Sequence, residues 1–401
     1  MKLLGKYNQF GLTVVAMLLF GVLSILVAPK TFAATRTWDG GGSDDNWSTA
    51  TNWDTDTAPV NGDDIVFTLA NSDINSTNDF SNLTVNSITV NGVTDDASDS
   101  VNIFITNPLT IAGNVTSSVA GDSTRLTLRG DIVLGSDVTM TNASIFARTG
   151  NEANDNLDLN GHTLTYKTDS LYTGLTINID QSITGSGTFT IDVRNSVSLF
   201  LASSVYTPNG NTYSGTTNLI TGTLSTSGGH TNKMFGTSTI NIGATATLGI
   251  ETDGTSPYIV SNPINIAAAT IGDNGYLDDQ LYVWAGALNQ VINISNITLN
   301  GNARFALNGS DGATVNLAGI QANGFCVQYG DETNFQAARF LNGPNACVIG
   351  DSTSSVTNVP GAPNTGEKIQ TKTGLIVASV VGVAIVGFVT RYMIVTKKLH
   401  K

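Results

Sequence analysis

Basic residues, histidine, cysteine and proline are all scarce in this sequence. The 401 residues include 18 Lys and Arg against 31 Asp and Glu, with three His, two Cys and nine Pro. Between residues 34 and 366 there are nine basic and 30 acidic residues, a formal net charge of −21. This charge repels polyanions and anionic lipid, which argues against nucleic acid as a partner.

The scarcity of basic residues also limits the catalytic chemistry. Polysaccharide lyases need a Lys or Arg base beside acidic residues, and glycoside hydrolases need two carboxylates a fixed distance apart. Between residues 34 and 366 the lysines are only Lys167 and Lys233. The sequence has three pairs of adjacent acidic residues, Asp63-Asp64, Asp95-Asp96 and Asp278-Asp279. The two members of such a pair point to opposite sides of a strand and therefore do not make such a site.

Other residues with catalytic or metal-binding potential are isolated. His162 follows Asn160-Gly161 at a predicted corner, and His230 lies in a Gly-rich loop. The N-terminal aspartates lack a regular calcium-ligand spacing; they are Asp39, Asp44 and Asp45. We therefore predict no catalytic residue, no metal site and no cofactor.

Helical periodicity is also missing between residues 34 and 350. Short stretches alternate apolar and polar residues instead, which is the period of a β-strand. The apolar members include Ile88/Val90, Ile103/Ile105, Leu126/Leu128, Phe189/Ile191/Val193 and Ile264/Ile266. Three Asn-Gly pairs follow such strands directly, where corners tolerate a left-handed backbone; they are Asn91-Gly92, Asn160-Gly161 and Asn300-Gly301.

Two architectures produce this pattern, a stacked solenoid or a string of β-sandwich domains. Sandwich modules of about 100 residues are joined by recognisable linkers, and none is evident between Val66 and Gly350. We predict an all-β fold, a parallel right-handed β-helix or solenoid, over residues 71–350. Residues 34–70 are expected to form its N-terminal cap.

Tryptophan is concentrated at the start of this region. Trp38, Trp47 and Trp53 are three of the four tryptophans in the chain and lie within sixteen residues. Bulky aromatics cover the exposed apolar edge of a first solenoid turn, which favours a cap. The alternative is that these three rings contact carbohydrate, because flat rings stack on sugars.

One segment of the central region matches a known repeat. Residues 211–224 read Asn-Thr-Tyr-Ser-Gly-Thr-Thr-Asn-Leu-Ile-Thr-Gly-Thr-Leu, and residues 240–248 continue the pattern. The segment resembles the repeat of autotransporter passenger domains, and the resemblance implies a β-solenoid. Autotransporters end in a membrane barrel of many strands, whereas this chain ends in one apolar segment and a basic tail.

The N-terminus has the three parts of a secretory signal peptide. Lys2 and Lys6 precede an apolar run from Leu12 to Val27, and Thr31-Phe32-Ala33 supplies the small residues that a signal peptidase reads. We predict a signal peptide over residues 1–33, with cleavage after Ala33. An uncut membrane anchor is the alternative.

The C-terminus predicts an anchor. Residues 351–366 form a Ser-, Thr- and Pro-containing stalk, 367–396 hold a membrane-spanning segment of about 20 apolar residues, and 397–401 form a basic cytoplasmic tail. Ala362-Pro363-Asn364-Thr365-Gly366 precedes the span. Motif, span and tail together resemble the cell-wall sorting signal Leu-Pro-x-Thr-Gly, with Ala362 in place of leucine.

The resemblance implies that a sortase cleaves Thr365–Gly366 and transfers the chain to peptidoglycan. A plain single-pass anchor is the alternative. Either anchor places residues 34–350 outside the cell, at the wall or plasma membrane.

The two cysteines are Cys326 and Cys347. An even pair in an oxidising compartment predicts a disulfide, and two reduced, buried thiols are the alternative.

The sequence as a whole predicts a non-catalytic surface protein, an adhesin or envelope structural component, whose glycan or other surface ligand it does not identify. A polysaccharide-degrading β-helix enzyme, a lyase or glycoside hydrolase, is the alternative function.

Overall fold

The computed structural model describes residues 33–93, 99–119, 126–146, 155–168, 176–179, 181–193, 198–202, 210–227, 234–252, 257–270, 279–309, 313–330 and 339–341. The chain divides into two compact units, Met1–Pro360 and Gly361–Lys401, and the described residues all belong to the first. Residues 1–32 of the predicted signal peptide lie outside the described residues, as do the predicted stalk, sorting motif, membrane segment and basic tail.

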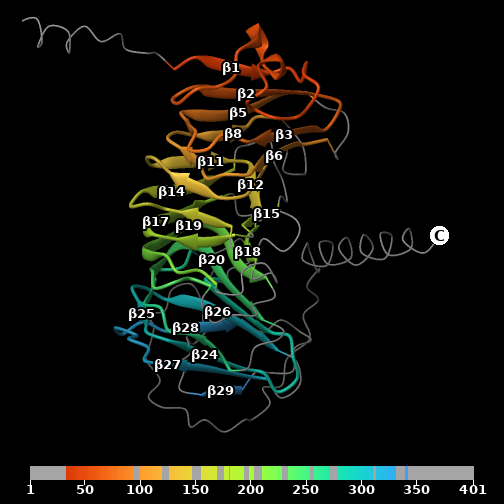
Figure 1. Ribbon diagram of the computed structural model, residues 1–401. Coiled ribbons are helices and arrows are strands. Elements are labelled where there is room, and N and C mark those ends of the chain that lie inside the picture. The colour runs from red at the N-terminus through yellow and green to blue at the C-terminus, as the bar shows by residue number, and fades with distance from the viewer. Residues whose placement is uncertain are drawn as a thin grey trace, which may run out of the picture. The chain divides into compact units, whose positions relative to one another are not determined.

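The described part of the first unit is a parallel β-solenoid, as the alternating pattern predicts (Figure 1). A rung is one turn of the solenoid, and a rung with three described strands has one on a first face, then one on a second face, then one on a third. Asp64 on the first face pairs with Ser87, which lies 23 residues further along the chain. The parallel pairing of equivalent strands from rung to rung excludes a string of antiparallel sandwiches.

The first face begins at the N-terminal end and continues down the stack. Its strands are β1 (Thr35–Trp38), β2 (Asp64–Ala70), β5 (Ser87–Val93), β8 (Val115–Ser117), β11 (Val138–Thr141), β14 (Thr163–Lys167), β17 (Ser186–Asp192), β22 (Ile264–Ile266) and β25 (Ile297–Leu299). The long strands β19 (Ser214–Ser227) and β20 (Thr239–Thr252) lie between β17 and β22 and extend onto the second face.

The other two faces are stacked in the same way. The second face contains β3 (Ile74–Asn78), β6 (Val101–Ile105), β9 (Leu126–Arg129), β12 (Ala143–Phe146), β15 (Thr176–Ile179), β18 (Ser198–Ala202), β23 (Leu281–Ala285), β26 (Ala303–Gly309) and β28 (Val327–Gly330). The third face contains β4 (Thr84–Val85), β7 (Leu109–Ile111), β10 (Ile132–Leu134), β13 (Asn156–Asp158) and β16 (Ser182–Thr184), and further along β21 (Tyr258–Val260), β24 (Val291–Ser295), β27 (Thr314–Ala318) and β29 (Arg339–Leu341).

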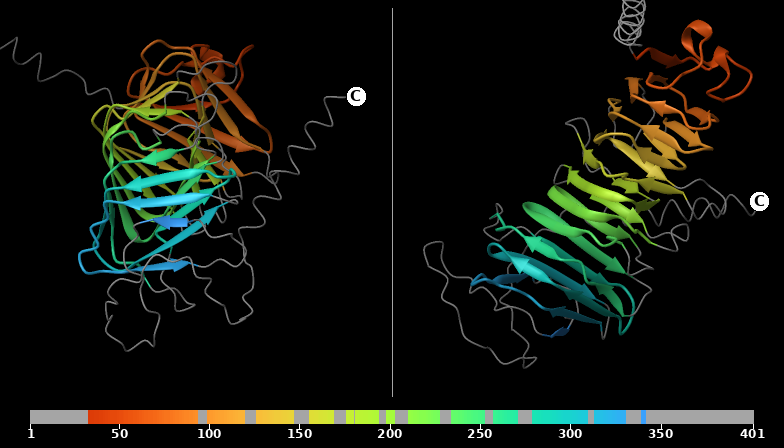
Figure 2. Two further views of the ribbon diagram at one scale, coloured as in Figure 1. Left: turned by 90° about the horizontal axis from the view of Figure 1, so that it is seen from below. Right: turned by 60° about the vertical axis from the view of Figure 1, so that its left-hand side comes forward.

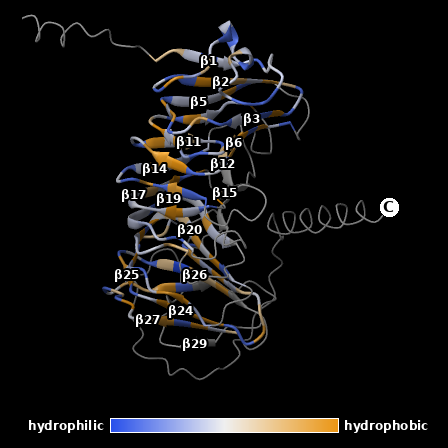
Figure 3. Cartoon of the chain, viewed as in Figure 1, coloured by the Kyte–Doolittle hydropathy of each residue, from blue (hydrophilic) through white to orange (hydrophobic). Residues whose placement is uncertain are grey.

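Apolar side chains fill the interior because every second residue of a strand points inward. Ile103, Ile105 and Leu128 are fully buried, as are Phe189 and Ile264. Figure 2 shows the strands surrounding this interior, and Figure 3 shows hydrophobic residues gathered along the strands with hydrophilic residues at the corners. The alternation in the sequence therefore identified the core.

Asparagines in a left-handed conformation link the corners of successive rungs through side-chain to backbone hydrogen bonds. Asn142 has φ +55° and donates its Nδ2 to the carbonyl of Ser117, one rung earlier, at 2.9 Å. Asn160, Asn296 and Asn323 also have positive φ and make the same kind of bond at 2.8–3.0 Å. A short amide side chain tolerates this backbone and satisfies an orphan carbonyl, which explains the high asparagine content of the corners.

One predicted corner is part of a strand instead. Asn91-Gly92 was expected to follow a strand, but β5 continues through both residues, which pair with Thr68 and Leu69 of β2. Gly92 has φ +105°, and a Cβ there would overlap the carbonyl oxygen of Leu69. The glycine is thus required by the close approach of two rungs rather than by a turn.

The passenger-like segment forms one rung and its interior network. The Tyr213 hydroxyl lies 2.7 Å from Thr217 Oγ1, which lies 2.8 Å from Ser238 Oγ. Asn211 accepts the backbone N–H of Ile183 at 2.7 Å and donates to the carbonyl of Met234 at 2.5 Å. Asn211, Tyr213 and Thr217 of this segment are therefore buried and hold neighbouring rungs together.

Candidate functional site

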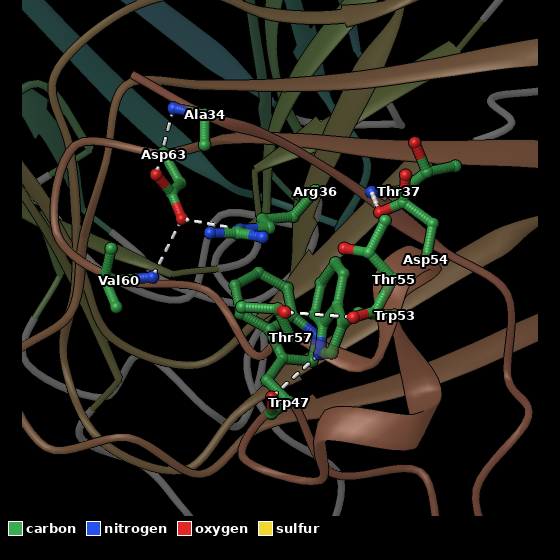
Figure 4. A network of polar contacts seen from close by, with 10 residues as sticks. All are labelled: Ala34, Arg36, Thr37, Trp47, Trp53, Asp54, Thr55, Thr57, Val60 and Asp63. Carbon is green, nitrogen blue, oxygen red and sulfur yellow. Dashed lines mark hydrogen bonds and ion pairs between the residues drawn. The ribbon is translucent and has the colours of Figure 1, made fainter. Parts of the chain in front are cut away.

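The three N-terminal tryptophans form one buried aromatic cluster around Phe67. The rings of Trp38 and Trp47 each meet Trp53 edge to face, with centroids 5.1 and 5.6 Å apart. The Trp53 indole N–H donates to the carbonyl of Trp47 at 2.8 Å (Figure 4), and Trp47 Nε1 donates to Ser76 Oγ at 3.1 Å. Two short 3₁₀ turns, Ala50–Asn52 and Asp54–Asp56, bring Trp53 under β1.

This packing decides which of these rings can reach a ligand. Trp47 and Trp53 have no exposed surface, so neither offers a face to a sugar. Trp38 is 8% exposed and lines a polar hollow of about 470 Å³ together with Asp39, Asp45 and Asp73. The geometry of Trp47 and Trp53 fits the cap interpretation rather than the carbohydrate-contact interpretation.

A second network joins β1 to the loop before β2. Asp63 accepts the Arg36 Nε–H at 3.0 Å and the backbone N–H groups of Val60 and Ala34 at 3.0 and 3.1 Å (Figure 4). The Asp63 side chain is only 4% exposed and that of Arg36 17%. Arg36 pairs in register with Ile65, whose side chain is fully buried, so the ion pair lies over the N-terminal end of the apolar interior.

Aspartates near the N-terminus accept local hydrogen bonds. Asp44 is held by local bonds, since its carboxylate accepts the Asn46 backbone N–H and the Thr49 hydroxyl, and these bonds lower its pKa. Across the described parts of the chain no group of three His, Cys, Asp or Glu side chains is placed to hold a metal ion.

An outward aromatic pair lies on the second face, on β23. Leu281, Val283 and Ala285 point into the core, so Tyr282 and Trp284 point outward, and both are partly exposed. The neighbouring rungs leave room beside Tyr282, because its register partners are Gly249 and Ala306. The benzo edge of Trp284 lies against Gly286, where an added Cβ would be 2.8 Å from the ring.

A carboxylate accompanies this aromatic pair. Glu251 is the register partner of Trp284 on β20, one rung earlier. Burial raises the pKa of the Glu251 carboxyl, and a hydrogen bond with Ser225 partly offsets that effect. On β26, Arg304 forms an ion pair with Asp279, with Nε 2.9 Å from Oδ1. Two aromatic rings, a carboxyl and an ion pair therefore share one lateral face.

We name Tyr282, Trp284 and Glu251 the β23 patch. The sequence analysis did not identify it, because Leu-Tyr-Val-Trp-Ala contains five apolar or aromatic residues in a row and its two faces look alike. The signal was present in the two bulky aromatics at positions i and i+2, which must share a side of a strand. The burial of Leu281, Val283 and Ala285 in the structure shows that this side faces outward.

Charged groups of the first face lie apart from the β23 patch. Lys167 Nζ lies 3.5 Å from Asp192 Oδ2 on the next rung, and His162 Nδ1 lies 3.8 Å from Asp137 Oδ1. His162 directly follows the left-handed corner Asn160-Gly161, as expected. On the second face, Arg129 of β9 is half-buried beside the Phe104 ring of β6, 5.9 Å from its centroid, and burial lowers the pKa of its guanidinium.

The remaining predicted sites are at the C-terminal end. Cys326 is buried and disulfide-bonded, and its backbone N–H donates to Asn302 Oδ1 at 3.2 Å. Cys347 is the other cysteine of the chain and lies outside the described residues, so the Cys326–Cys347 pairing stays a prediction. The sorting motif 362–366 also lies outside them. None of the helices in the described ranges is long and apolar enough to cross a membrane.

The comparisons with known proteins do not narrow the function. No protein-family model, no curated protein and no solved structure matches this chain.

Proposed function

We propose that this chain is a non-catalytic cell-surface protein, an adhesin that binds glycans on the lateral face of its solenoid. The observation that carries this proposal is the outward Tyr282–Trp284 pair beside Glu251. Aromatic side chains that point away from a filled core make no contribution to its packing, and Tyr and Trp combine a flat apolar ring with a polar group. Such rings stack on the C–H faces of sugars while carboxyl groups bind sugar hydroxyls.

The solenoid itself supports a role in display. Its rungs bury their apolar residues between neighbours, so the lateral faces are free to carry ligand-binding residues. Asn and Thr side chains line part of the first face, where Asn241 donates to Asn218 at 2.9 Å and Asn265 donates to Asn241 at 2.8 Å. These side-chain amides thus hydrogen-bond one another from rung to rung, which is consistent with a structural role for this face.

Binding to a glycan array tests the proposal. The purified full chain is expected to bind a subset of glycans, and Trp284→Ala or Tyr282→Ala should weaken that binding at least tenfold. Thr165→Ala, which removes an outward side chain of the first face, is the matched control and should leave binding unchanged. Retention of full affinity in both aromatic variants would refute the β23 patch as the binding surface.

Glu251 favours one alternative function, a glycoside hydrolase. A carboxyl group with a raised pKa beside aromatic rings has the property that a general acid needs. Incubation of the full chain with polysaccharides, followed by an assay for new reducing ends, separates the two functions. Release of reducing ends by the wild type that is lost in Glu251→Gln identifies the enzyme, and binding without cleavage identifies the adhesin.

Export and anchoring are part of the proposal. The predicted signal peptide directs the chain out of the cell, and the sorting motif or the apolar span holds it at the envelope. Thr365→Ala should move the protein from the wall fraction to the membrane or the medium. Unchanged fractionation, with a mature chain that still contains Lys401, would rule out sortase processing.

A further inference from the structure

The Asp63 carboxylate accepts a hydrogen bond from the backbone N–H of Ala34, the residue that follows the predicted cleavage site. Asp63 Oδ1 accepts the Ala34 N–H at 3.1 Å, while Oδ2 accepts Arg36 and Val60. The carboxylate is nearly inaccessible, whereas Ala33 is exposed and Ala34 only partly buried. A buried carboxylate therefore faces a nitrogen at the edge of the fold (Figure 4).

Residues that come later in the chain hold this nitrogen in place. The Asp64 N–H donates to the carbonyl of Ala34 at 2.8 Å, and Thr35 pairs in register with Asp64. β1 continues the pairing from Arg36 to Trp38, which packs into the aromatic cluster. The position of the Ala34 nitrogen thus depends on contacts that remain if the peptide bond before it is cut.

We propose that cleavage after Ala33 converts the Ala34 nitrogen into an ammonium group that forms an ion pair with Asp63 and locks the N-terminal cap. The proposal rests on the proposed export of the chain. Hydrolysis breaks the Ala33–Ala34 C–N bond, the water oxygen becomes part of the Ala33 carboxylate, and the freed amine takes up protons. The neutral N–H donor at Asp63 Oδ1 becomes a charged donor, and charge-assisted hydrogen bonds are about twice as strong as neutral ones.

The charges around Ala34 favour the ammonium form. Asp63 contacts it directly, and Asp64 is the neighbouring carboxylate, held on the outer side by Asn86 and Ser87. Arg36 has the opposite effect on an ammonium group, but it bonds the other oxygen of Asp63. Attraction to the nearer carboxylate oxygen exceeds repulsion by the guanidinium beyond it, so the mature chain carries a cation at this corner of the cap.

The test begins with the chain exported by a bacterial host that processes it. Mass spectrometry of the purified protein should give an N-terminal peptide that starts at Ala34. The labelling rate of this α-amine with an acylating reagent, measured against pH, reports its pKa. We expect a pKa at least one unit above the ordinary value of about 8, which corresponds to labelling about tenfold slower at neutral pH.

Three variants separate the ion pair from a merely structural role of Asp63. Asp63→Asn should return the amine pKa to its ordinary value. Arg36→Gln removes a competing cation and should raise the amine pKa further, a result that loss of packing does not produce. Asp54→Asn is the matched control, because Asp54 also accepts a β1 backbone N–H, that of Thr37 at 2.9 Å, and should leave the amine pKa raised.

The outcomes distinguish the lock from the export on which it rests. A mature chain that starts elsewhere than Ala34 overturns both the cleavage position and the lock. A chain that starts at Ala34 but has an ordinary amine pKa, or one that Asp54→Asn lowers as much as Asp63→Asn, overturns the lock and leaves export intact. If Asp63→Asn does not fold, the wild-type pKa and the Arg36→Gln shift still decide.

Discussion

The hydroxyl of Tyr213 lies 2.7 Å from Thr217 Oγ1, and both groups are buried within one rung. Tyr166 is the comparison, since its ring is equally buried and both tyrosines meet Phe189 edge to face. The Tyr166 hydroxyl has no hydrogen-bond partner among the described residues. Burial raises the pKa of both phenols, so both are neutral at physiological pH.

The two tyrosines should therefore respond oppositely to loss of the hydroxyl. Tyr213→Phe removes a satisfied hydrogen bond and should lower the free energy of unfolding by about 1 kcal/mol. Tyr166→Phe removes an unsatisfied buried group and should be neutral or stabilising by up to about 1 kcal/mol. Thermal melts of the two variants, recorded side by side, check this. Equal destabilisation by both would mean that Tyr166 has a partner in the rest of the chain.

A second prediction compares Gly215, which closely approaches Gly187 on the neighbouring rung, with Gly62, which has open space around it. Gly215 has φ +115°, and an added Cβ would overlap the carbonyl oxygen of Gly187, its partner on the rung before. Gly62 has φ +90°, but an added Cβ there would meet no atom within 4 Å. Gly62→Ala should cost about 1 kcal/mol from backbone strain alone, and Gly215→Ala should cost several kcal/mol, because the steric overlap separates β17 from β19.

Denaturant midpoints of the two alanine variants measure that difference. Similar midpoints would show that the stack yields easily between β17 and β19.

The aromatic cap and the β23 patch provide a matched pair of tryptophans. Trp53→Ala empties a fully buried site and removes the bond to the Trp47 carbonyl, so it should lower stability by about 3–5 kcal/mol. Trp284→Ala removes a partly exposed outward ring and should cost about 1 kcal/mol or less. Protease resistance of the N-terminal rungs and the melting temperature measure both effects. A larger loss for Trp284→Ala would assign that ring to packing rather than to binding.

Glu251 predicts a dependence of stability on pH. Burial raises its pKa above the ordinary 4.5 in the folded protein, so the folded state holds the proton more tightly than the unfolded state. The contribution to stability is fully present below about pH 4.5 and is lost as pH rises through the folded-state pKa. Glu251→Gln carries no titrating charge, so its melting temperature should exceed that of the wild type at neutral pH and converge with it in acid. The opposite order at neutral pH would mean that the folded state stabilises the carboxylate.

Much of the fold followed from local alternation. Ile103, Ile105 and Leu126 were assigned to the interior because apolar residues recur at every second position, and the structure buries all three. This inference works because side-chain direction in a strand depends only on the pleat. The Asn160-Gly161 corner was also predicted, since few residues adopt a positive φ without strain.

The β23 patch and the Arg36–Asp63 pair could not be predicted in the same way. Tyr282 and Trp284 point outward because Leu281 and Val283 point inward, and all four residues are hydrophobic or aromatic. Asp63 meets Arg36, 27 residues earlier in the chain, because β1 pairs with β2. Both contacts depend on which residue lies opposite which on the next rung.

The sequence by itself determined the strand period, the buried set and the corners, because each of these is a property of a few consecutive residues. The tertiary structure decided the register between rungs, and register sets what each outward side chain meets. Successive rungs differ in length, since Ser87 follows Asp64 by 23 residues whereas Ile297 follows its partner Ile264 by 33. Loops of unequal length conceal the register in the sequence, and only backbone pairing between rungs fixes it.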